Sequence, residues 1–194
     1  MDWLDKFNII LGSGSPRRVQ LMQESGYQFT QNVIEVDESF DPSMPIETVA
    51  EHLAVKKSQA HTLNPQDLLI TADSVVVIDK TILGKPKDAH QATKYLNMLS
   101  GTSHLVYTGV CIRSKNRMKA FTATSEVWMR LLTAGEIDHY VTHYAPYDRA
   151  GSYGIQDWLG HNCVEKIIGS YTNIMGLPTA RLYQELQKFV GNHQ

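Results

Sequence analysis

The sequence predicts an α/β protein in which strands and helices pack in layers. Strand-like and helix-like patterns alternate along all 194 residues, and 42% of the residues are hydrophobic while 20% are charged. No linker, internal repeat or low-complexity stretch divides the chain. A chain of this length and composition buries a sizeable core, so we expect one domain over residues 1–194, either an ordinary globular domain or two small lobes that share a core.

The first elements are an apolar strand at 7–11 and a helix that begins after a turn rich in glycine and serine. Ser15 suits the N-cap of this helix, Pro16 suits its first position, and Gly26 suits its end after Ser25. Further helices are expected at 46–61, 88–99, from Thr133 onward and after Pro178, and further strands at 27–34, 68–78, 103–112, 119–131 and 163–168. Residues 144–162 predict a functional or irregular loop.

Composition and charge exclude several classes of protein. The net charge of −2 does not indicate a protein that binds nucleic acid duplexes. Two cysteines, Cys111 and Cys163, are too few for a disulfide scaffold and predict reduced core thiols. The start of the chain lacks the basic, then apolar, pattern of a secretory signal, and the longest apolar candidate, 68–83, is interrupted by charges. We expect a cytoplasmic protein with no membrane partner.

The turn between the first strand and the first helix predicts an anion site. Its sequence from Gly12 to Arg18 matches neither the dinucleotide-binding glycine pattern nor the P-loop pattern. A helix start nevertheless attracts phosphate, because its N–H groups are unpaired. Arg17 and Arg18 weaken the first turn slightly, a cost that an anion bound by their guanidinium groups would offset. The alternative is a solvated basic helix end.

Asp73 is an unusual residue for its position. It lies within 68–78, the most strand-like stretch of the chain, although aspartate suits neither a sheet nor burial. A carboxylate in such a place needs a metal ion, a cation or a catalytic role to offset its desolvation. The alternative is a strand end at which Asp73 faces solvent.

Lys57 falls near the middle of the apolar stripe of its helix, whereas Lys56 lies at the flank of that stripe. A lysine on the buried side of a helix either extends to solvent or meets a negative partner. The partner is either an incoming phosphate or an internal aspartate or glutamate.

Other polar clusters carry weaker signals. Glu35, Asp37 and Glu38 follow a strand, and acids at such a place can bind Mg²⁺ through their oxygens. Lys85 lies in a rigid turn before Pro86. A pair of histidines, His139 and His143, has metal-ligand spacing, but the glutamate of the zinc-protease motif does not accompany it.

In combination, these residues resemble the Maf family of nucleoside triphosphate pyrophosphatases. The likeness runs in order along nearly the whole chain, so the series is more specific than any of its parts. The matching segments are 11–18 (Leu-Gly-Ser-Gly-Ser-Pro-Arg-Arg), Glu38, Lys57, 71–74 (Thr-Ala-Asp-Ser), 83–86 (Leu-Gly-Lys-Pro), 99–101 (Leu-Ser-Gly), 107–109 (Tyr-Thr-Gly), 150–156 (Ala-Gly-Ser-Tyr-Gly-Ile-Gln), 164–167 (Val-Glu-Lys-Ile) and 176–178 (Gly-Leu-Pro).

The resemblance implies a mixed, twisted sheet flanked by helices, with two lobes around a nucleotide cleft. It also implies hydrolysis of a nucleoside triphosphate at the α-phosphorus, with a divalent cation, Mg²⁺ or Mn²⁺, as cofactor. By position, Asp73 would accept the proton of water, and Glu38 with Asp73 would hold the metal. Lys57 and Lys85 would contact phosphates, as would the turn residues Ser13, Ser15 and Arg18.

Three positions are implied to select the base, and here they are Arg17, Ser74 and Gln156. They look like the dTTP/UTP branch of the family, except that this branch usually has threonine where Ser74 stands. Ser74 keeps the hydroxyl and loses only a methyl contact. Roles in sanitation of the nucleotide pool and in cell division arrest, and a homodimer, are implied by the resemblance alone.

Three alternatives to this function stay open from the sequence. The chain could be a nucleotide-binding regulator of cell division without significant catalysis. It could run the same reaction on 7-methyl-GTP or on a modified pyrimidine nucleotide. It could also be a generic α/β domain whose turn binds a sugar phosphate.

Overall fold

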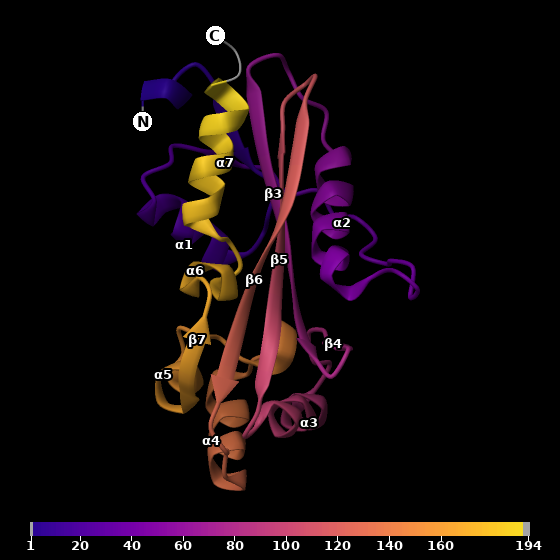
Figure 1. Cartoon of the computed structure of the whole chain (residues 1–194), viewed down its shortest axis with the longest axis vertical. Helices are drawn as coiled ribbons and strands as arrows, with labels where there is room; N and C mark the ends of the chain where they lie inside the picture. The colour runs from indigo at the N-terminus through magenta and orange to yellow at the C-terminus, as the bar shows by residue number, and fades with distance from the viewer. Residues whose placement is uncertain (1, 192–194) are drawn as a thin grey trace. The chain divides into compact units, whose positions relative to one another are not determined.

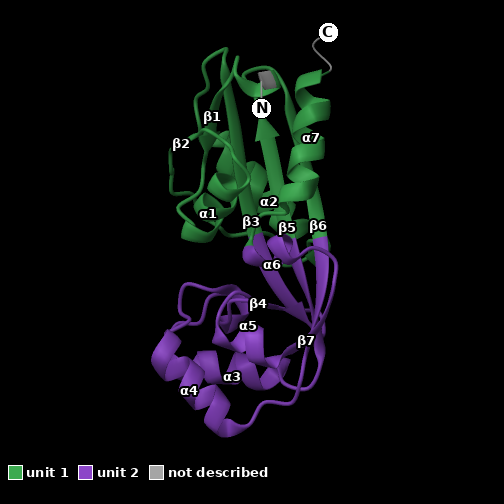
Figure 2. Ribbon diagram, turned by 90° about the vertical axis from the view of Figure 1, so that its left-hand side faces the viewer, with its two compact units in different colours: residues 1–73, 108–123, 176–194 green, residues 74–107, 124–175 purple. Residues whose placement is uncertain are grey.

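The computed structural model describes residues 2–191 and divides the chain into two compact units. Unit 1 comprises residues 1–73, 108–123 and 176–194, and unit 2 comprises residues 74–107 and 124–175. Figure 2 colours the two units separately. Three long strands, β3 (Asp67–Ile78), β5 (Ser103–Arg113) and β6 (Met118–Met129), each contribute residues to both units.

Unit 1 contains a parallel part of the sheet, centred on the first strand of the chain. Strand β1 (Asn8–Leu11) pairs in parallel with β2 (Thr30–Gln31) on one side and with the first part of β3 on the other, where Leu11 pairs with Ile70. The strand order through the sheet is β2-β1-β3-β5-β6-β7, with β4 beside β3. The β3 residues of this unit are buried up to Ala72, since they are covered on both faces.

Helices cover both sides of the sheet in unit 1. Figure 1 shows α1 (Pro16–Glu24) and α7 (Thr179–Gly191) on one side and α2 (Ile46–Gln59) on the other. Helix α2 lies directly on β5 at Gly109, where an added Cβ would stand 2.2 Å from the Ala50 carbonyl carbon. Only glycine permits so close an approach of two backbones, so Gly109 sets the depth at which α2 sits on the sheet.

Unit 2 contains an antiparallel hairpin and most of the remaining helices. The last residues of β3 turn through Asp79 and Lys80, both with positive φ (47° and 62°), into β4 (Thr81–Leu83). Two consecutive left-handed residues are the requirement of a type I′ hairpin turn. The other elements of the unit are α3 (Ala89–Leu99), α4 (Ala134–Tyr144), the short 3₁₀ helix η2 (Ala150–Ser152), α5 (Trp158–Cys163), β7 (Val164–Ile168, antiparallel to β6) and α6 (Tyr171–Met175).

The predicted fold class is confirmed: parallel and antiparallel pairs form one mixed sheet, and helices flank it. The strands expected at 68–78, 103–112, 119–131 and 163–168 are confirmed with small changes at their ends. So are the helices expected at 46–61 and 88–99 and after Pro178, and the helix expected after Thr133 has the full capping box with Glu136. Both cysteines are buried and free, as predicted.

Two local predictions are wrong. The extended pattern at 27–34 forms a strand only at Thr30–Gln31, and the loop expected at 144–162 contains η2 and α5. The short helices were not visible in the pattern because six residues complete fewer than two helical turns, which leaves no periodicity to read. Within residues 2–191, none of the helices is both long enough and apolar enough to cross a membrane.

Candidate functional site

The turn after β1 is organised by Ser13. This buried residue follows Gly12, and its Oγ accepts hydrogen bonds from the Ser15 backbone N–H (3.3 Å) and from Arg18 Nη1 (3.1 Å). Ser15 is the N-cap of α1, as predicted, but its own side chain makes no capping hydrogen bond within the described residues. The Arg18 and Val19 backbone N–H groups donate to the Ser15 carbonyl oxygen, each at 3.1 Å, and Pro16 has no N–H. The positive end of the α1 dipole lies at this turn, where it favours an anion.

Arg18 is buried beside this turn, with 9% of its surface exposed. Its Nε donates to the Gly176 carbonyl oxygen at 2.8 Å, which anchors the guanidinium between the first turn and the segment before α7. Burial lowers the pKa of Arg18, while Asp73 raises it, Arg17 lowers it and Glu38 raises it. The two carboxylates thus lie within electrostatic reach of the buried guanidinium.

Lys57 joins two carboxylates that the sequence places far apart. Its Nζ lies 2.5 Å from Asp73 Oδ1 and 2.8 Å from Glu38 Oε1. Helix α2 carries Lys57 on the face that packs on the sheet, and β3 carries Asp73 at the point where its buried run ends. The Lys57 and Asp73 side chains are 16% and 13% exposed, whereas that of Glu38 is 54% exposed.

These contacts decide one alternative that the sequence left open, for Asp73, and show internal acids beside Lys57. Asp73 is not a solvent-facing residue at a strand end, because its side chain is largely buried and paired with a cation. The partners of Lys57 in the described residues are internal acids. Only one oxygen of Asp73 is occupied in this way, because Oδ2 has no hydrogen-bond donor among residues 2–191.

The other acids near Glu38 have different surroundings. Asp37 is exposed and accepts hydrogen bonds from the Ser39 side chain and backbone and from Lys56, contacts that lower its pKa. Glu35 is exposed. Within the described residues there is no group of three or more histidine, cysteine or acidic side chains that could hold a metal ion, and this includes the neighbourhood of His139 and His143. Glu38 and Asp73 are two carboxylates that meet at Lys57.

Three further predicted residues belong to unit 2. Ser74 follows Asp73 in β3 and is half-buried, and Lys85 is exposed in the turn between β4 and α3. Gln156 lies in the loop before α5, and its Oε1 is buried with no hydrogen-bond partner among the described residues. The structure therefore brings Ser13, Arg18, Glu38, Lys57 and Asp73 together in unit 1, while Ser74, Lys85 and Gln156 are residues of unit 2.

Sequence reasoning missed a second polar centre, which is also in unit 2. The buried hydroxyl of Tyr140 in α4 contacts Arg149, Asp157 and the backbone of Gly154. The sequence held one signal for part of it, since Asp157 precedes Trp158 as an N-cap residue precedes a helix. No spacing rule could have linked Asp157 to Tyr140, which is 17 residues earlier.

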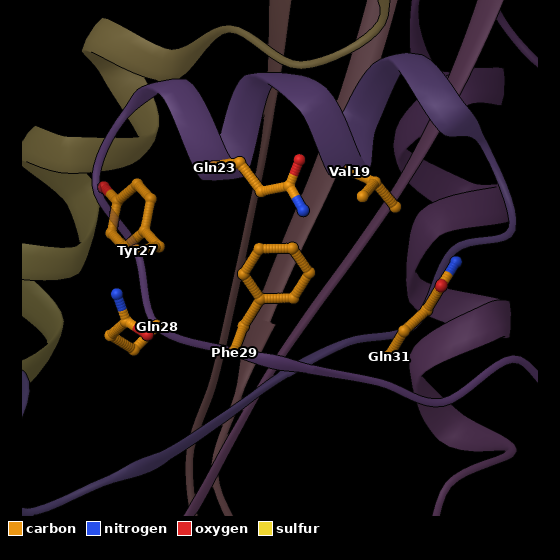
Figure 3. Close-up of a pocket in the computed structure, with 6 residues that line it drawn as sticks. All are labelled: Val19, Gln23, Tyr27, Gln28, Phe29 and Gln31. Carbon is orange, nitrogen blue, oxygen red and sulfur yellow. The ribbon is translucent and has the colours of Figure 1, made fainter.

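Unit 1 also contains a cavity of about 390 Å³ between α1 and the segment that follows it (Figure 3). Its six lining residues are Val19, Gln23, Tyr27, Gln28, Phe29 and Gln31. None of the predicted site residues lines it. Gln31 connects it to the turn, because its Nε2 donates to the Ser13 carbonyl oxygen at 2.7 Å.

Two curated relatives and one solved structure are similar to this chain. The dTTP/UTP pyrophosphatase of Porphyromonas gingivalis (strain W83) is 43% identical over 194 residues, which is 97% of this chain and 98% of that protein. The dTTP/UTP pyrophosphatase of Bacteroides thetaiotaomicron is 44% identical over 188 residues, 95% of this chain and 97% of that protein. Among solved structures, a HAM1 protein from Coxiella burnetii has a TM-score of 0.48 and 16% identity, over 94% of this chain and 99% of that chain.

The family model for Maf-like proteins matches residues 8–189. This range runs from the first residue of β1 into α7 and includes every predicted site residue. The chain belongs to the Maf family.

Proposed function

We propose that this chain is a nucleoside triphosphate pyrophosphatase that hydrolyses dTTP and UTP to the nucleoside monophosphate and pyrophosphate. The observation that carries the proposal is the largely buried Asp73, which is held by Lys57 and keeps one carboxylate oxygen without a donor within residues 2–191. The curated relatives described above are dTTP/UTP pyrophosphatases, and they align with this chain over nearly their whole length. The names of these relatives support the choice of substrate, and the contacts of Asp73 in unit 1 support the type of reaction.

In the proposed reaction Asp73 is the general base. The oxygen of a water molecule attacks the α-phosphorus, the bond from that phosphorus to the bridging oxygen breaks, and pyrophosphate leaves. The proton of the water passes to Asp73 Oδ2, since Oδ1 accepts from Lys57. A positioned carboxylate of this kind contributes about a hundredfold to ten-thousandfold to a rate.

The positive groups of unit 1 would bind the triphosphate. The start of α1 contributes the positive end of its helix dipole, and the buried guanidinium of Arg18 adds a positive charge that Ser13 and Gly176 hold in place. Lys57 and, by resemblance, Lys85 would stabilise the pyrophosphate as it leaves. Groups that are fixed before the reaction stabilise developing charge without having to reorganise.

The donor set of unit 1 fits the divalent cation that the family implies. Mg²⁺ is commonly bound by one or two carboxylates together with substrate phosphates and water. Glu38 and Asp73 converge on one cationic group, and the exposed Glu38 keeps access from solvent. We propose that these two residues would hold Mg²⁺ or Mn²⁺. When bound, such an ion neutralises phosphate charge and makes water more acidic.

We propose that Arg17, Ser74 and Gln156 select the base. A glutamine side chain offers both a donor and an acceptor, which suits the edge of thymine or uracil with its O4 acceptor and N3–H donor. The buried and unpartnered Gln156 Oε1 supports this role, because an unpaired buried acceptor costs about 1–3 kcal/mol and a ligand donor would satisfy it.

Release of pyrophosphate across a panel of nucleoside triphosphates, with and without Mg²⁺, tests the proposal. We expect release from dTTP and UTP in the presence of the metal. No hydrolysis of any nucleotide would contradict the proposal and favour a binding protein or a generic sugar-phosphate site. Preference for 7-methyl-GTP would keep the reaction and overturn the choice of base. Asp73→Ala serves as the control for a contaminating activity.

A further inference from the structure

Gln156 lies in a loop, residues 150–157, that the rest of unit 2 holds at several points. We propose that the Tyr140 hydroxyl is the positioning group that fixes this loop so that Gln156 can recognise the base. The inference rests on the proposed function, because it assigns no substrate of its own. It concerns Tyr140, a residue of α4 that lies outside the sequence motif containing Gln156.

The Tyr140 hydroxyl contacts the loop on both sides of Gln156. It accepts a hydrogen bond from the Gly154 backbone N–H (3.1 Å) and donates one to Asp157 Oδ2 (2.8 Å). It also accepts one from Arg149 Nη1 (3.0 Å). A phenol has one proton and two lone pairs, so these three partners use its whole hydrogen-bonding capacity. The side chain is fully buried, which strengthens such a network.

The partners of Tyr140 also hold one another. Arg149 forms an ion pair with Asp157, and the Asp157 backbone N–H donates to the Gly154 carbonyl oxygen at 3.1 Å. The carboxylate lies so close to Gly154 that an added Cβ would stand 2.6 Å from Asp157 Oδ2. The chain around Gln156 is therefore a tight turn whose two sides, Gly154 and Asp157, both bind the Tyr140 hydroxyl.

Other contacts fix the rest of the loop. Gly151 packs on Val76, where an added Cβ would stand 2.9 Å from Cγ1, and it adopts a positive φ of 69°. Tyr153 is buried, and its hydroxyl lies 2.7 Å from His104 Nε2. Within the loop as described, the Gln156 Oε1 is then a buried acceptor on a fixed backbone without a partner. A fixed amide discriminates between bases far better than a mobile one, because an unmatched base leaves it unpaired.

The test compares Tyr140→Phe with the wild type on dTTP and dCTP, since cytosine lacks the N3–H donor of thymine. The readout is the ratio of kcat/KM for dTTP to kcat/KM for dCTP. We expect this ratio to fall by about tenfold in Tyr140→Phe, mainly through the KM for dTTP, because a Gln156 amide that is no longer held in place discriminates less well between the two bases. In a Gln156→Ala background the same substitution should leave the ratio unchanged.

A matched control and a second variant keep the test independent of folding. Tyr27→Phe also removes a buried hydroxyl, but one that has no hydrogen-bond partner within residues 2–191 and lies in unit 1. It should leave the ratio unchanged. If Tyr140→Phe does not fold, Arg149→Met removes one donor to the hydroxyl together with the ion pair to Asp157, and it should also lower the ratio.

The outcomes separate this inference from the proposed function. A wild type that hydrolyses no nucleotide overturns both. If Gln156→Ala does not lower the ratio, base recognition by Gln156 is wrong, and the positioning role with it. If Gln156→Ala lowers the ratio but Tyr140→Phe does not, or if Tyr140→Phe still lowers it when Gln156 is absent, the positioning role alone is wrong.

Discussion

The two polar centres described above are built from similar groups. They differ in how much of the hydrogen-bonding capacity of the central group is occupied. In unit 1 Lys57 joins Glu38 and Asp73, and one oxygen of Asp73 has no donor among the described residues. In unit 2 Arg149 and Asp157 meet on the hydroxyl of Tyr140, which is fully used. A carboxylate that acts as a base needs a free acceptor oxygen. A hydroxyl that positions a loop is most effective when all of its hydrogen bonds are made.

The largest effect should come from removing the spare oxygen of the first centre. We expect Asp73→Asn to lower kcat for dTTP by a hundredfold to about ten-thousandfold, the range for loss of a general base. Its amide oxygen can still accept from Lys57, so the affinity for dTTP should change by less than about threefold, within 1 kcal/mol. Steady-state kinetics and titration calorimetry measure the two quantities. An Asn variant that stays active with the metal would remove Asp73 from this role.

A second prediction disturbs the first centre without touching its charges. In Gly109→Ala the new methyl group would meet the backbone of α2 at 2.2 Å, so the helix that carries Lys57 must move. Overpacking against backbone costs about 3 kcal/mol, and urea unfolding should show a loss of that size together with lower activity. Gly135→Ala is the matched control, because nothing lies within 4 Å of its added Cβ. It should keep or slightly raise stability, by up to about 1 kcal/mol.

The third prediction measures how strongly the groups of the first centre depend on one another. Lys57→Met leaves Asp73 largely buried without its cation, and the partial exposure of the pair limits the cost to about 1–3 kcal/mol of unfolding free energy. In Asp73→Asn the unpaired charge is gone, so adding Lys57→Met should cost less. Urea unfolding of both single variants and the double variant gives the coupling. Strict additivity would mean that the ion pair contributes nothing to stability.

The last prediction concerns the pH dependence of stability that buried His104 introduces. Burial lowers the pKa of His104 from 6.5 to about 4. Below pH 6.5 His104 is protonated in the unfolded chain but stays neutral in the native protein. Its contribution to the free energy of unfolding is therefore fully present above pH 6.5 and is lost as the pH falls toward 4. The loss is about 1.4 kcal/mol per pH unit. His61, whose pKa burial also lowers, adds to it in the wild type.

His104→Gln isolates the contribution of His104. Its unfolding free energy should fall less than that of the wild type between pH 6.5 and pH 5, a window that lies above the titration of most carboxylates. Thermal unfolding in matched buffers at the two pH values measures the difference. Equal losses in both proteins would show that His104 is not neutral and buried in the native state.

Local pattern predicted the first centre much better than the second. Asp73 and Lys57 stand out because each carries a charge at a position that its own strand or helix would bury. Such positions can be read from the sequence, because side chains repeat every two residues in a strand and every 3.6 residues in a helix. Glu38 gave only a weak signal, since its contact with Lys57 depends on the path of an irregular segment. Tyr140 gave none, because a buried tyrosine in an amphipathic helix looks like any core residue until the loop that it holds is seen. The short helices α5 and α6 also gave no signal, because they are too short to show a period. Tertiary contacts fix α5 instead, such as the close approach of Gly160 to Ile155.

The most direct test of the central claim follows the attacking oxygen. The wild type would hydrolyse dTTP in water labelled with a heavy oxygen isotope, and mass spectrometry would locate the label in the products. Attack on the α-phosphorus by water that Asp73 deprotonates puts the label in dTMP and leaves the pyrophosphate unlabelled. Label in pyrophosphate or in inorganic phosphate would place the attack at another phosphorus and contradict the account.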